Sequence, residues 1–174
     1  MNVYLETERL ILRSFRDGDL DEYAAIFGDP DVMRFLGGKP MSRQDAWRNM
    51  AMIMGHWHFR GFGFFAVEEK ASGRLVGRVG HWQPEGWPGF EIGWAIGPDF
   101  WGRGYAREAA LFCRDYAFEV MGREAIISSI HPDNVNSIRL AERIGETYWR
   151  DDQVMEIPVR LYRLTRETWS GLRR

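Results

Sequence analysis

The chain has 174 residues, a formal net charge of −2, 45% hydrophobic and 28% charged residues, and one cysteine, Cys113. These values predict a single globular domain over residues 1–174, and they exclude a disulfide framework. The charge gives no electrostatic case for binding nucleic acid or an anionic membrane, and no stretch approaches the roughly 20 apolar residues of a membrane span. The N-terminus has no signal-peptide core, so we expect a cytoplasmic protein.

The N-terminal third of the chain alternates between strand-like and helical patterns. We expect a strand at residues 9–15, a helix at 17–27, a short helical turn at 29–36 before the pair Gly37-Gly38, and a helix at 42–59. Asp17 and Ser42 are residue types that cap helix N-termini, and apolar residues recur behind both at helical spacing.

Three strand-like runs with short connections follow. They occupy residues 62–70, 75–82 and 90–96. The turn residues Ala71-Ser72-Gly73 join the first two, and a loop rich in proline and glycine at 83–89 leads into the third. These connections predict an antiparallel meander.

The third of these strands continues into a glycine-rich turn at 97–104, a long helix at 105–121 and a strand at 125–130. A helical crossover of this kind joins parallel strands. The remaining predicted elements are a helix at 134–145 and strands at 147–150 and 158–164. We therefore predict an α+β fold, a mixed and mostly antiparallel seven-stranded sheet with one central βαβ unit, flanked by helices.

The turn before the long helix carries unusual charges. A helix N-terminus is partially positive and favours acidic side chains, yet Arg103 and Arg107 lie here. Gly102 and Gly104 leave the backbone N–H groups open to a ligand. We interpret the turn as a phosphate or pyrophosphate site, with an ordinary turn carrying two solvated arginines as the alternative. A P-loop and a dinucleotide fingerprint both fit poorly, because the turn lacks a lysine and Arg107 stands where a third glycine belongs.

Four segments carry a resemblance that covers nearly the whole chain. They read LETERLILRSF, DPDVMRFLGG, EIGWAIGPDFWGRGYAREA and HPDNVNSIRLAERIG. In this order they resemble the GNAT superfamily of acetyl-CoA-dependent N-acetyltransferases, in the branch similar to the Rim-type ribosomal-protein N-terminal acetyltransferases. The resemblance implies acetyl-CoA as co-substrate, and a GNAT-like sheet whose fourth and fifth strands are parallel and splayed.

The resemblance also implies a set of coenzyme-binding residues. In the family, backbone N–H groups of the turn cradle the pyrophosphate, the pantetheine pairs with the fourth strand, and the next helix contacts the coenzyme arm. Carried onto this chain, the set is Ala95, Ile96, Trp101, Gly102, Arg103, Gly104, Tyr105, Ala106, Arg107, Asn134 and Ser137. Trp101 departs from the superfamily pattern but is usual in the Rim-like branch.

The implied reaction is direct attack of an amine on the thioester, which needs no covalent enzyme nucleophile. A backbone N–H near Ile96 is the expected oxyanion donor. Many family members place a proton-donating tyrosine where this chain has Ala141, so Ser137 is the nearest replacement, with Asn134 beside it on the same helix. The alternative for Ser137 is a polar residue that only binds the coenzyme.

Glu91 is the candidate general base. It is the one acidic residue in an otherwise apolar central strand, and burial would raise its pKa toward neutrality. A structural carboxylate is the equal alternative. His81, at the end of the preceding strand, is the second candidate base and a candidate substrate contact.

The acceptor is expected opposite the coenzyme, a primary amine on a small molecule or a peptide. We expect it between Phe35 and Leu36 and a loop at 149–157, whose acids Asp151, Asp152 and Glu156 suit a cation but are more simply solvated. The resemblance leaves open a CoA-binding regulatory module without catalysis, or another acyl-CoA as donor. We expect no metal and a monomer or homodimer.

Overall fold

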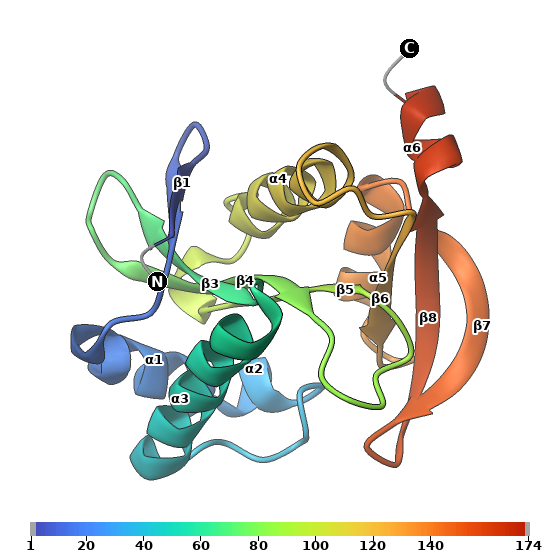
Figure 1. The fold of residues 1–174 in the computed structure, drawn as a ribbon. Coiled ribbons are helices and arrows are strands. Elements are labelled where there is room, and N and C mark those ends of the chain that lie inside the picture. The colour runs from blue at the N-terminus through green and yellow to red at the C-terminus, as the bar shows by residue number, and fades with distance from the viewer. Residues whose placement is uncertain (1–2, 173–174) are drawn as a thin grey trace.

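One sheet of eight strands organises the computed structural model, which describes residues 3–172 (Figure 1). The strands are β1 (Tyr4–Glu6), β2 (Leu10–Arg13), β3 (Phe64–Glu69), β4 (Leu75–Trp82), β5 (Glu91–Ile96), β6 (Ala125–Ile130), β7 (Thr147–Val154) and β8 (Ile157–Thr165). The helices are α1 (Leu20–Phe27), α2 (Pro30–Met33), α3 (Arg43–Arg60), α4 (Tyr105–Glu119), α5 (Val135–Arg143) and α6 (Arg166–Leu172), with 3-10 turns at Asp17–Asp19 and Pro98–Phe100. Their order across the sheet is β1-β2-β3-β4-β5-β6-β8-β7, and only β5 and β6 pair in parallel. Within residues 3–172, no helix has the length and apolar character that a bilayer crossing requires.

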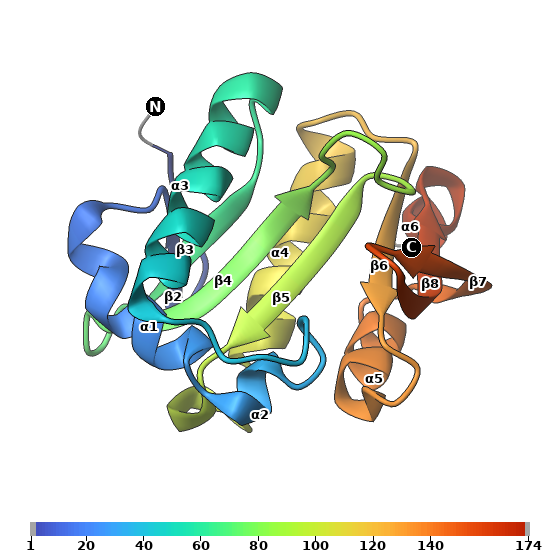
Figure 2. The same cartoon turned by 90° about the horizontal axis from the view of Figure 1, so that it is seen from below.

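Helices cover both faces of the sheet, with α1 and α3 on one face and α4 on the other (Figure 2). Side chains of a strand alternate between the two faces. Trp82 of β4 stacks on His56 of α3 with ring centroids 4.2 Å apart, whereas Nε2 of the adjacent His81 lies 2.9 Å from the Cys113 carbonyl of α4. Glu91 pairs with Trp82 in the β4–β5 register. Glu91 and His81 therefore lie on opposite faces of the sheet.

The predicted α+β fold, with its parallel pair inside a mostly antiparallel sheet, is confirmed, but the predicted number of seven strands is wrong by one. The additional strand is β1, which pairs with β2 at the edge of the sheet. It has three residues, too few for a period of two to be recognised in the sequence. The strand predicted at 9–15 is shortened to β2, and α4 ends before residue 121.

The segment at 149–157 is not the loop that we predicted. β7 extends through Val154 and β8 begins at Ile157, so that only Met155 and Glu156 form the connecting turn. Both turn residues have positive φ, 50° and 65°. Two-residue hairpin turns of this kind usually contain asparagine or glycine. A Met-Glu pair carries no such signal, which is why the hairpin was missed.

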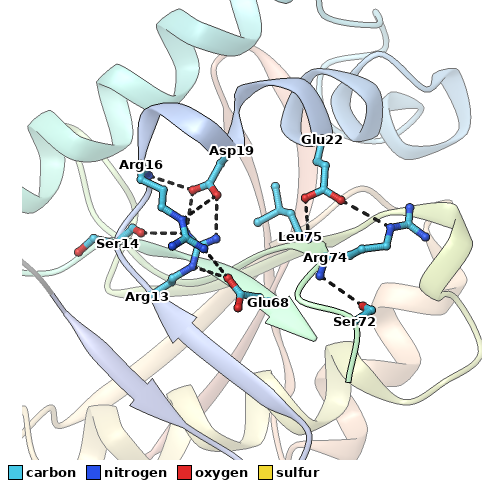
Figure 3. Close-up of polar contacts among 9 residues, drawn as sticks. All are labelled: Arg13, Ser14, Arg16, Asp19, Glu22, Glu68, Ser72, Arg74 and Leu75. Atoms are coloured by element: carbon cyan, nitrogen blue, oxygen red, sulfur yellow. Dashed lines mark hydrogen bonds and ion pairs between the residues drawn. The ribbon is translucent and has the colours of Figure 1, made fainter. Parts of the chain in front are cut away.

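A buried ion network fixes β2 and β3 to the first helical layer (Figure 3). Arg13 donates from Nη1 and Nη2 to the two carboxylate oxygens of Asp19 at 2.8 and 2.7 Å, and from Nε to Glu68 at 2.8 Å. Arg13 and Asp19 are both buried. Burial alone would raise the pKa of Asp19, but the hydrogen bonds and charge of Arg13 hold it below its ordinary value.

Replacing Arg13 with methionine should lower the free energy of unfolding by about 3 kcal/mol, because it removes the buried guanidinium that binds both oxygens of the buried Asp19 carboxylate. Arg16→Met is the matched control: Arg16 contacts the same two carboxylates from an exposed position, and its loss should cost less than about 1 kcal/mol. Urea unfolding of both variants at pH 7 measures the difference. Equal losses of unfolding free energy in the two variants would contradict a special contribution of the buried Arg13.

The same network predicts a pH dependence. A depressed folded-state pKa contributes stability above the ordinary aspartate value of 3.8, and this stability is lost as the pH falls through the folded pKa of Asp19. The loss of stability on acidification should therefore be smaller in Arg13→Met than in the wild-type protein. Parallel curves of stability against pH for the two proteins would contradict a lowered pKa of Asp19 caused by Arg13.

Candidate active site

The cleft begins where β5 and β6 separate. The two strands share a single register pair, Glu91 opposite Ile127, where the Phe90 carbonyl accepts a hydrogen bond from the Ile127 N–H at 2.9 Å. One step further, the hydroxyl of Ser128 takes the place of a backbone donor and lies 2.8 Å from the Ile92 carbonyl. Beyond this point the two strands diverge (Figure 2).

This divergence leaves the backbone N–H and C=O of Trp94 and the N–H of Ile96 without a partner strand, while the Ile96 carbonyl accepts from the Trp101 indole. Successive residues of a strand direct their N–H and C=O groups to opposite neighbours, and Ile92 points toward β6. Trp94 and Ile96 continue that series, whereas the N–H and C=O of Ala95 point toward β4. We predicted pantetheine pairing at Ala95 and Ile96; the alternation favours Ile96 and puts Trp94 in the place of Ala95.

The turn after β5 depends on glycine at two positions. Gly102 and Gly104 have φ of 75° and 80°, in the left-handed region where other side chains are strained. Gly104 is the N-cap residue of α4 and provides no side-chain cap, so the first N–H groups of the helix stay open. The indole N–H of Trp101 donates to the Ile96 carbonyl at 2.7 Å and fastens the turn to the end of β5.

A cavity of about 620 Å³ lies between the end of β5, this turn, α5 and the segment that follows α2. Three arginines line it: Arg107 in the first turn of α4, and Arg139 and Arg143 on α5. None of the three forms an ion pair with another residue of the described range 3–172. The cavity therefore combines an open helix N-terminus with free positive charge.

Most of the predicted site residues line this cavity. From the coenzyme set they are Ala95, Ile96, Trp101, Gly102, Gly104, Tyr105, Ala106, Arg107, Asn134 and Ser137, and from the acceptor set Phe35 and Leu36. Arg103, Glu91 and His81 are not among the lining residues.

Arg103 turns away from the cavity. Its Nη1 lies 3.5 Å from Glu69 Oε1, and its guanidinium carbon lies 5.4 Å from the centre of the Phe100 ring. Of the two arginines that the sequence singles out in the turn, only Arg107 faces the proposed anion site.

The position of His81 contradicts a role in contacting substrate. The side chain is fully buried beneath α4, bound to the Cys113 carbonyl and stacked on Phe90 at 5.1 Å. Burial lowers the pKa of His81 to about 4. A neutral, enclosed imidazole on this face belongs to the core.

Glu91 has the environment that a general base requires. The carboxyl is buried, and its Oε2 accepts hydrogen bonds from the Trp87 indole at 2.6 Å and from the Ser129 hydroxyl at 2.8 Å. Burial raises the pKa of Glu91 to about 7, although these two hydrogen bonds act in the opposite direction. Its other oxygen, Oε1, lies on the Gly93 side, where an added Cβ would stand 3.3 Å away.

Ser137 and Asn134 occupy the start of α5. The Asn134 side chain accepts from the Ser137 N–H at 3.1 Å and so caps the helix. The Ser137 oxygen accepts from the Trp94 indole N–H at 3.2 Å. Because this bond uses an oxygen lone pair, the hydroxyl proton of Ser137 stays available to an acceptor in the cavity.

Ser128 and Glu146 form a buried pair that the sequence analysis did not identify. The Ser128 oxygen lies 2.8 Å from the Ile92 carbonyl and 3.1 Å from Glu146 Oε1. A hydroxyl has one proton, so both contacts are hydrogen bonds only if the Glu146 carboxyl carries a proton of its own. Burial raises the pKa of Glu146 well above its ordinary value, against the effect of Ser128, and the charge of Glu91 raises it further.

Arg139 and Arg143 were also missed. They are four residues apart and so share a helix face, which was a readable signal in the sequence. The acids at 151 and 152, which suit a cation but were more simply expected to be solvated, have arginine neighbours: Asp152 pairs with Arg150 at 2.7 Å, and Asp151 lies 4.0 Å from Arg160. Among residues 3–172, no three His, Cys, Asp or Glu side chains form a group that could hold a metal ion.

A second, smaller cavity of about 250 Å³ lies between the β4–β5 loop and the β7–β8 hairpin. Residues 84–88 line it on one side and residues 153–155 on the other. Trp87 joins this cavity to the base candidate, because its ring is part of the lining while its indole N–H binds Glu91.

Residues 9–147 match the family described as the acetyltransferase (GNAT) domain. The chain belongs to this GNAT acetyltransferase family. The resemblance inferred from the four sequence segments is thereby confirmed at the level of the family, and membership supports acyl transfer as the general reaction.

Relatives of the chain cover nearly its whole length. The uncharacterized protein YkkB of Bacillus subtilis (strain 168) is 34% identical over 167 residues, which cover 91% of this chain and 93% of that protein. An acetyltransferase from Agrobacterium tumefaciens str. C58 is similar in structure, with a TM-score of 0.84 and 31% identity over 93% of this chain and 94% of the other. The fold likeness extends to spermidine N-acetyltransferase from Vibrio cholerae, solved with CoA and spermine, with a TM-score of 0.75 and 19% identity over 94% and 99%.

The Ser128–Glu146 pair predicts how stability changes with pH. A raised folded-state pKa gives stability that is fully present below the unfolded value near 4.5 and is lost as the pH rises through the folded pKa of Glu146. Glu146→Gln keeps a donor for Ser128 at every pH, so its stability should decline less between pH 5 and pH 8. Urea unfolding at these two pH values measures this; Glu91 is present in both proteins, so its contribution cancels. Parallel curves would contradict a protonated Glu146.

Proposed function

We propose that this GNAT protein transfers an acetyl group from acetyl-CoA to a primary amine, on a small molecule or a peptide N-terminus, by direct attack on the thioester. The observation that carries the proposal is the cavity in which the free backbone edge of β5 meets the open N-terminus of α4. Coenzyme A requires both features, a hydrogen-bonding edge for its amide-bearing arm and an anion site for its pyrophosphate.

The charges of the cavity match those of the coenzyme. Backbone N–H groups of residues 102–106 lie at the positive end of α4, where a pyrophosphate is stabilised. Arg107 adds a cation to the same end, and Arg139 and Arg143 supply two more from α5. We assign these three side chains to the phosphate groups of the coenzyme, in place of the Arg103 and Arg107 pair expected from the sequence.

The pantetheine arm would run along the freed edge of β5, pairing with Trp94 and Ile96. The acetyl carbonyl would then lie near the Ile96 N–H. A backbone N–H held in this position stabilises the negative charge that develops on that oxygen when the amine attacks. The Ile96 N–H shares its peptide plane with the Ala95 carbonyl, which points toward the paired strand β4, and the Trp101 indole holds the following peptide through the Ile96 carbonyl.

The reaction moves two protons. As the amine nitrogen bonds to the acetyl carbon and the carbon–sulfur bond breaks, the nitrogen loses one proton and the leaving thiolate gains another. Glu91 is the proposed acceptor of the first, directly or through water, because its pKa of about 7 keeps a carboxylate available near neutral pH. Ser137 is the proposed donor of the second, since its hydroxyl proton is free to face the cavity.

The amine acceptor is proposed to approach Glu91 from the side opposite the coenzyme. The 250 Å³ cavity beside Trp87 offers room there, and Phe35 and Leu36 border the larger cavity from the α2 side. The spermidine N-acetyltransferase of the same fold acts on an amine by its name, which is compatible with this class of acceptor.

Calorimetric titration with acetyl-CoA tests the donor half of the proposal. Wild-type protein should bind, and Gly102→Glu should not, because Gly102 lines the cavity with open space around it and a carboxylate there would repel the pyrophosphate. Gly61→Glu is the matched control, since Gly61 is also a left-handed glycine with open space, but at the far end of α3. If wild-type protein fails to bind acetyl-CoA, or Gly102→Glu binds normally, the site is refuted.

Release of CoA thiol over a panel of amines and N-terminal peptides tests turnover with the same protein. Acetylation of any panel amine supports the enzyme. Binding without turnover on a broad panel would support the alternative, a CoA-binding regulatory module, and turnover only with a longer acyl-CoA would replace the acetyl donor.

The role of Glu91 predicts a pH–rate profile. Because the carboxylate is the active form, kcat/KM should rise with pH up to about 7 and then level. Glu91→Gln should lose this rise and lower kcat/KM by about 10²- to 10⁴-fold. Glu124→Gln, an exposed acid that is in the lining of neither cavity, is the control and should behave as wild type. A wild-type profile in Glu91→Gln would make Glu91 a structural carboxylate.

A further inference from the structure

The coenzyme turn is supported from behind by the short turn between β1 and β2. Glu108, in the first turn of α4, accepts hydrogen bonds from the Thr7 hydroxyl at 2.6 Å and from the Arg9 N–H at 2.8 Å through Oε1. Its Oε2 accepts from Arg9 Nε at 2.7 Å. Burial would raise the pKa of Glu108, but these hydrogen bonds hold it below its ordinary value.

Arg9 extends this contact to the coenzyme turn itself. Its Nη1 donates to the carbonyl of Arg103 at 2.9 Å, and its guanidinium carbon lies 4.6 Å from the centre of the Tyr105 ring. One planar guanidinium therefore joins three parts of the chain: its own turn, Glu108 of α4, and the peptide bond before Gly104. We refer to Thr7, Arg9 and Glu108 as the rear clamp.

We propose that the rear clamp is a positioning device for the coenzyme pyrophosphate. In a planar trans peptide, the carbonyl of one residue and the N–H of the next point in opposite directions. Arg9 holds the Arg103 carbonyl on the outer side, toward β2. The Gly104 N–H of the same peptide is consequently directed to the other side, where Gly104 lines the cavity. The proposal rests on the proposed function for the identity of the ligand.

Such a support is needed because the turn contains two glycines. Gly102 and Gly104 both adopt positive φ, and a glycine reaches other conformations about as easily. A turn free to rotate this peptide would have to be ordered each time the coenzyme binds, which costs affinity. Arg9 fixes the orientation in advance without contacting the ligand.

Lys70, in the connection between β3 and β4, provides a matched control because its side chain contacts the same β1–β2 turn. Its Nζ donates to the Thr7 carbonyl at 2.7 Å and pairs with Glu6 at 2.7 Å. Replacing Lys70 removes one positive charge beside the β1–β2 turn, as replacing Arg9 removes one from it, but leaves the bond to the Arg103 carbonyl intact. A comparison of the two separates peptide positioning from general charge.

The test measures CoA affinity by calorimetry for the wild-type protein, Arg9→Met, Glu108→Gln and Lys70→Met. We expect Arg9→Met to weaken binding about tenfold, which is the loss of one hydrogen bond from a charged donor. Glu108→Gln should weaken it less, and Lys70→Met should stay within about twofold of wild type. In turnover, the KM for acetyl-CoA should rise in Arg9→Met while kcat at saturation is retained, because Arg9 does not touch the reacting atoms.

A second readout does not depend on the ligand. In ¹H–¹⁵N NMR spectra of the unliganded protein, the Gly104 amide signal should shift or broaden in Arg9→Met and keep its place in Lys70→Met. If wild-type protein does not bind CoA, the proposed function fails, and this spectrum still tests the clamp. If Arg9→Met does not fold, Arg9→Lys takes its place.

Two results would overturn the proposal. One is wild-type CoA affinity together with an unmoved Gly104 signal in the Arg9 variant. The other is an equal loss of affinity in Lys70→Met, which would mean that charge alone matters.

Discussion

The separation of β5 from β6 after Glu91 is the constraint on which the rest of the site depends. Elsewhere in the sheet, neighbouring strands satisfy each other's backbone groups. Here the pairing ends after one register pair, and buried backbone groups without partners are costly. The side chains of Ser128 and Trp101 satisfy the carbonyls of Ile92 and Ile96. The backbone groups of Trp94 and the N–H of Ile96 stay open to a ligand. This strand edge can therefore pair with an extended ligand that carries amide groups.

The charges around this edge divide the cleft into two halves. Toward α4 and α5 it carries the open helix N-terminus and the cations Arg107, Arg139 and Arg143. Beyond its lining, toward the β4–β5 loop, lies Glu91, a carboxyl whose burial raises its pKa to about 7. Under the proposed function, the first half attracts the anionic coenzyme and Glu91 in the second accepts a proton from the amine. The freed edge of β5 joins the two, which is the arrangement that amine attack on a bound thioester requires.

Features set by local sequence could be predicted, and features set by contacts across the sheet could not. The glycine-dependent turn after β5 and the helix start behind it are confirmed, because both are local signals, while the anion site in that turn stays a prediction. The sequence could not predict which arginine of the turn lines the cavity. Arg103 is held outside it by contacts with Glu69 and Phe100, which are distant or unrecognised as partners in the sequence.

The dependence on contacts across the sheet also explains why His81 was misplaced and why the Ser128–Glu146 pair was not predicted. His81 was taken for a site residue because the face of a strand-end side chain is unknown until the β4–β5 register is known. The Ser128–Glu146 pair links β6 to the start of β7, so no spacing in the sequence announces it. Glu91, in contrast, stood out as a single acid in an apolar strand, and it is buried with a raised pKa.

A crystal structure with bound CoA tests the central claim most directly. The account predicts the pyrophosphate within hydrogen-bond distance of the N–H groups of residues 102–106, and the pantetheine amides paired with Trp94 and Ile96. Coenzyme bound elsewhere on the protein, or β5 and β6 paired along their full length in the complex, would contradict it.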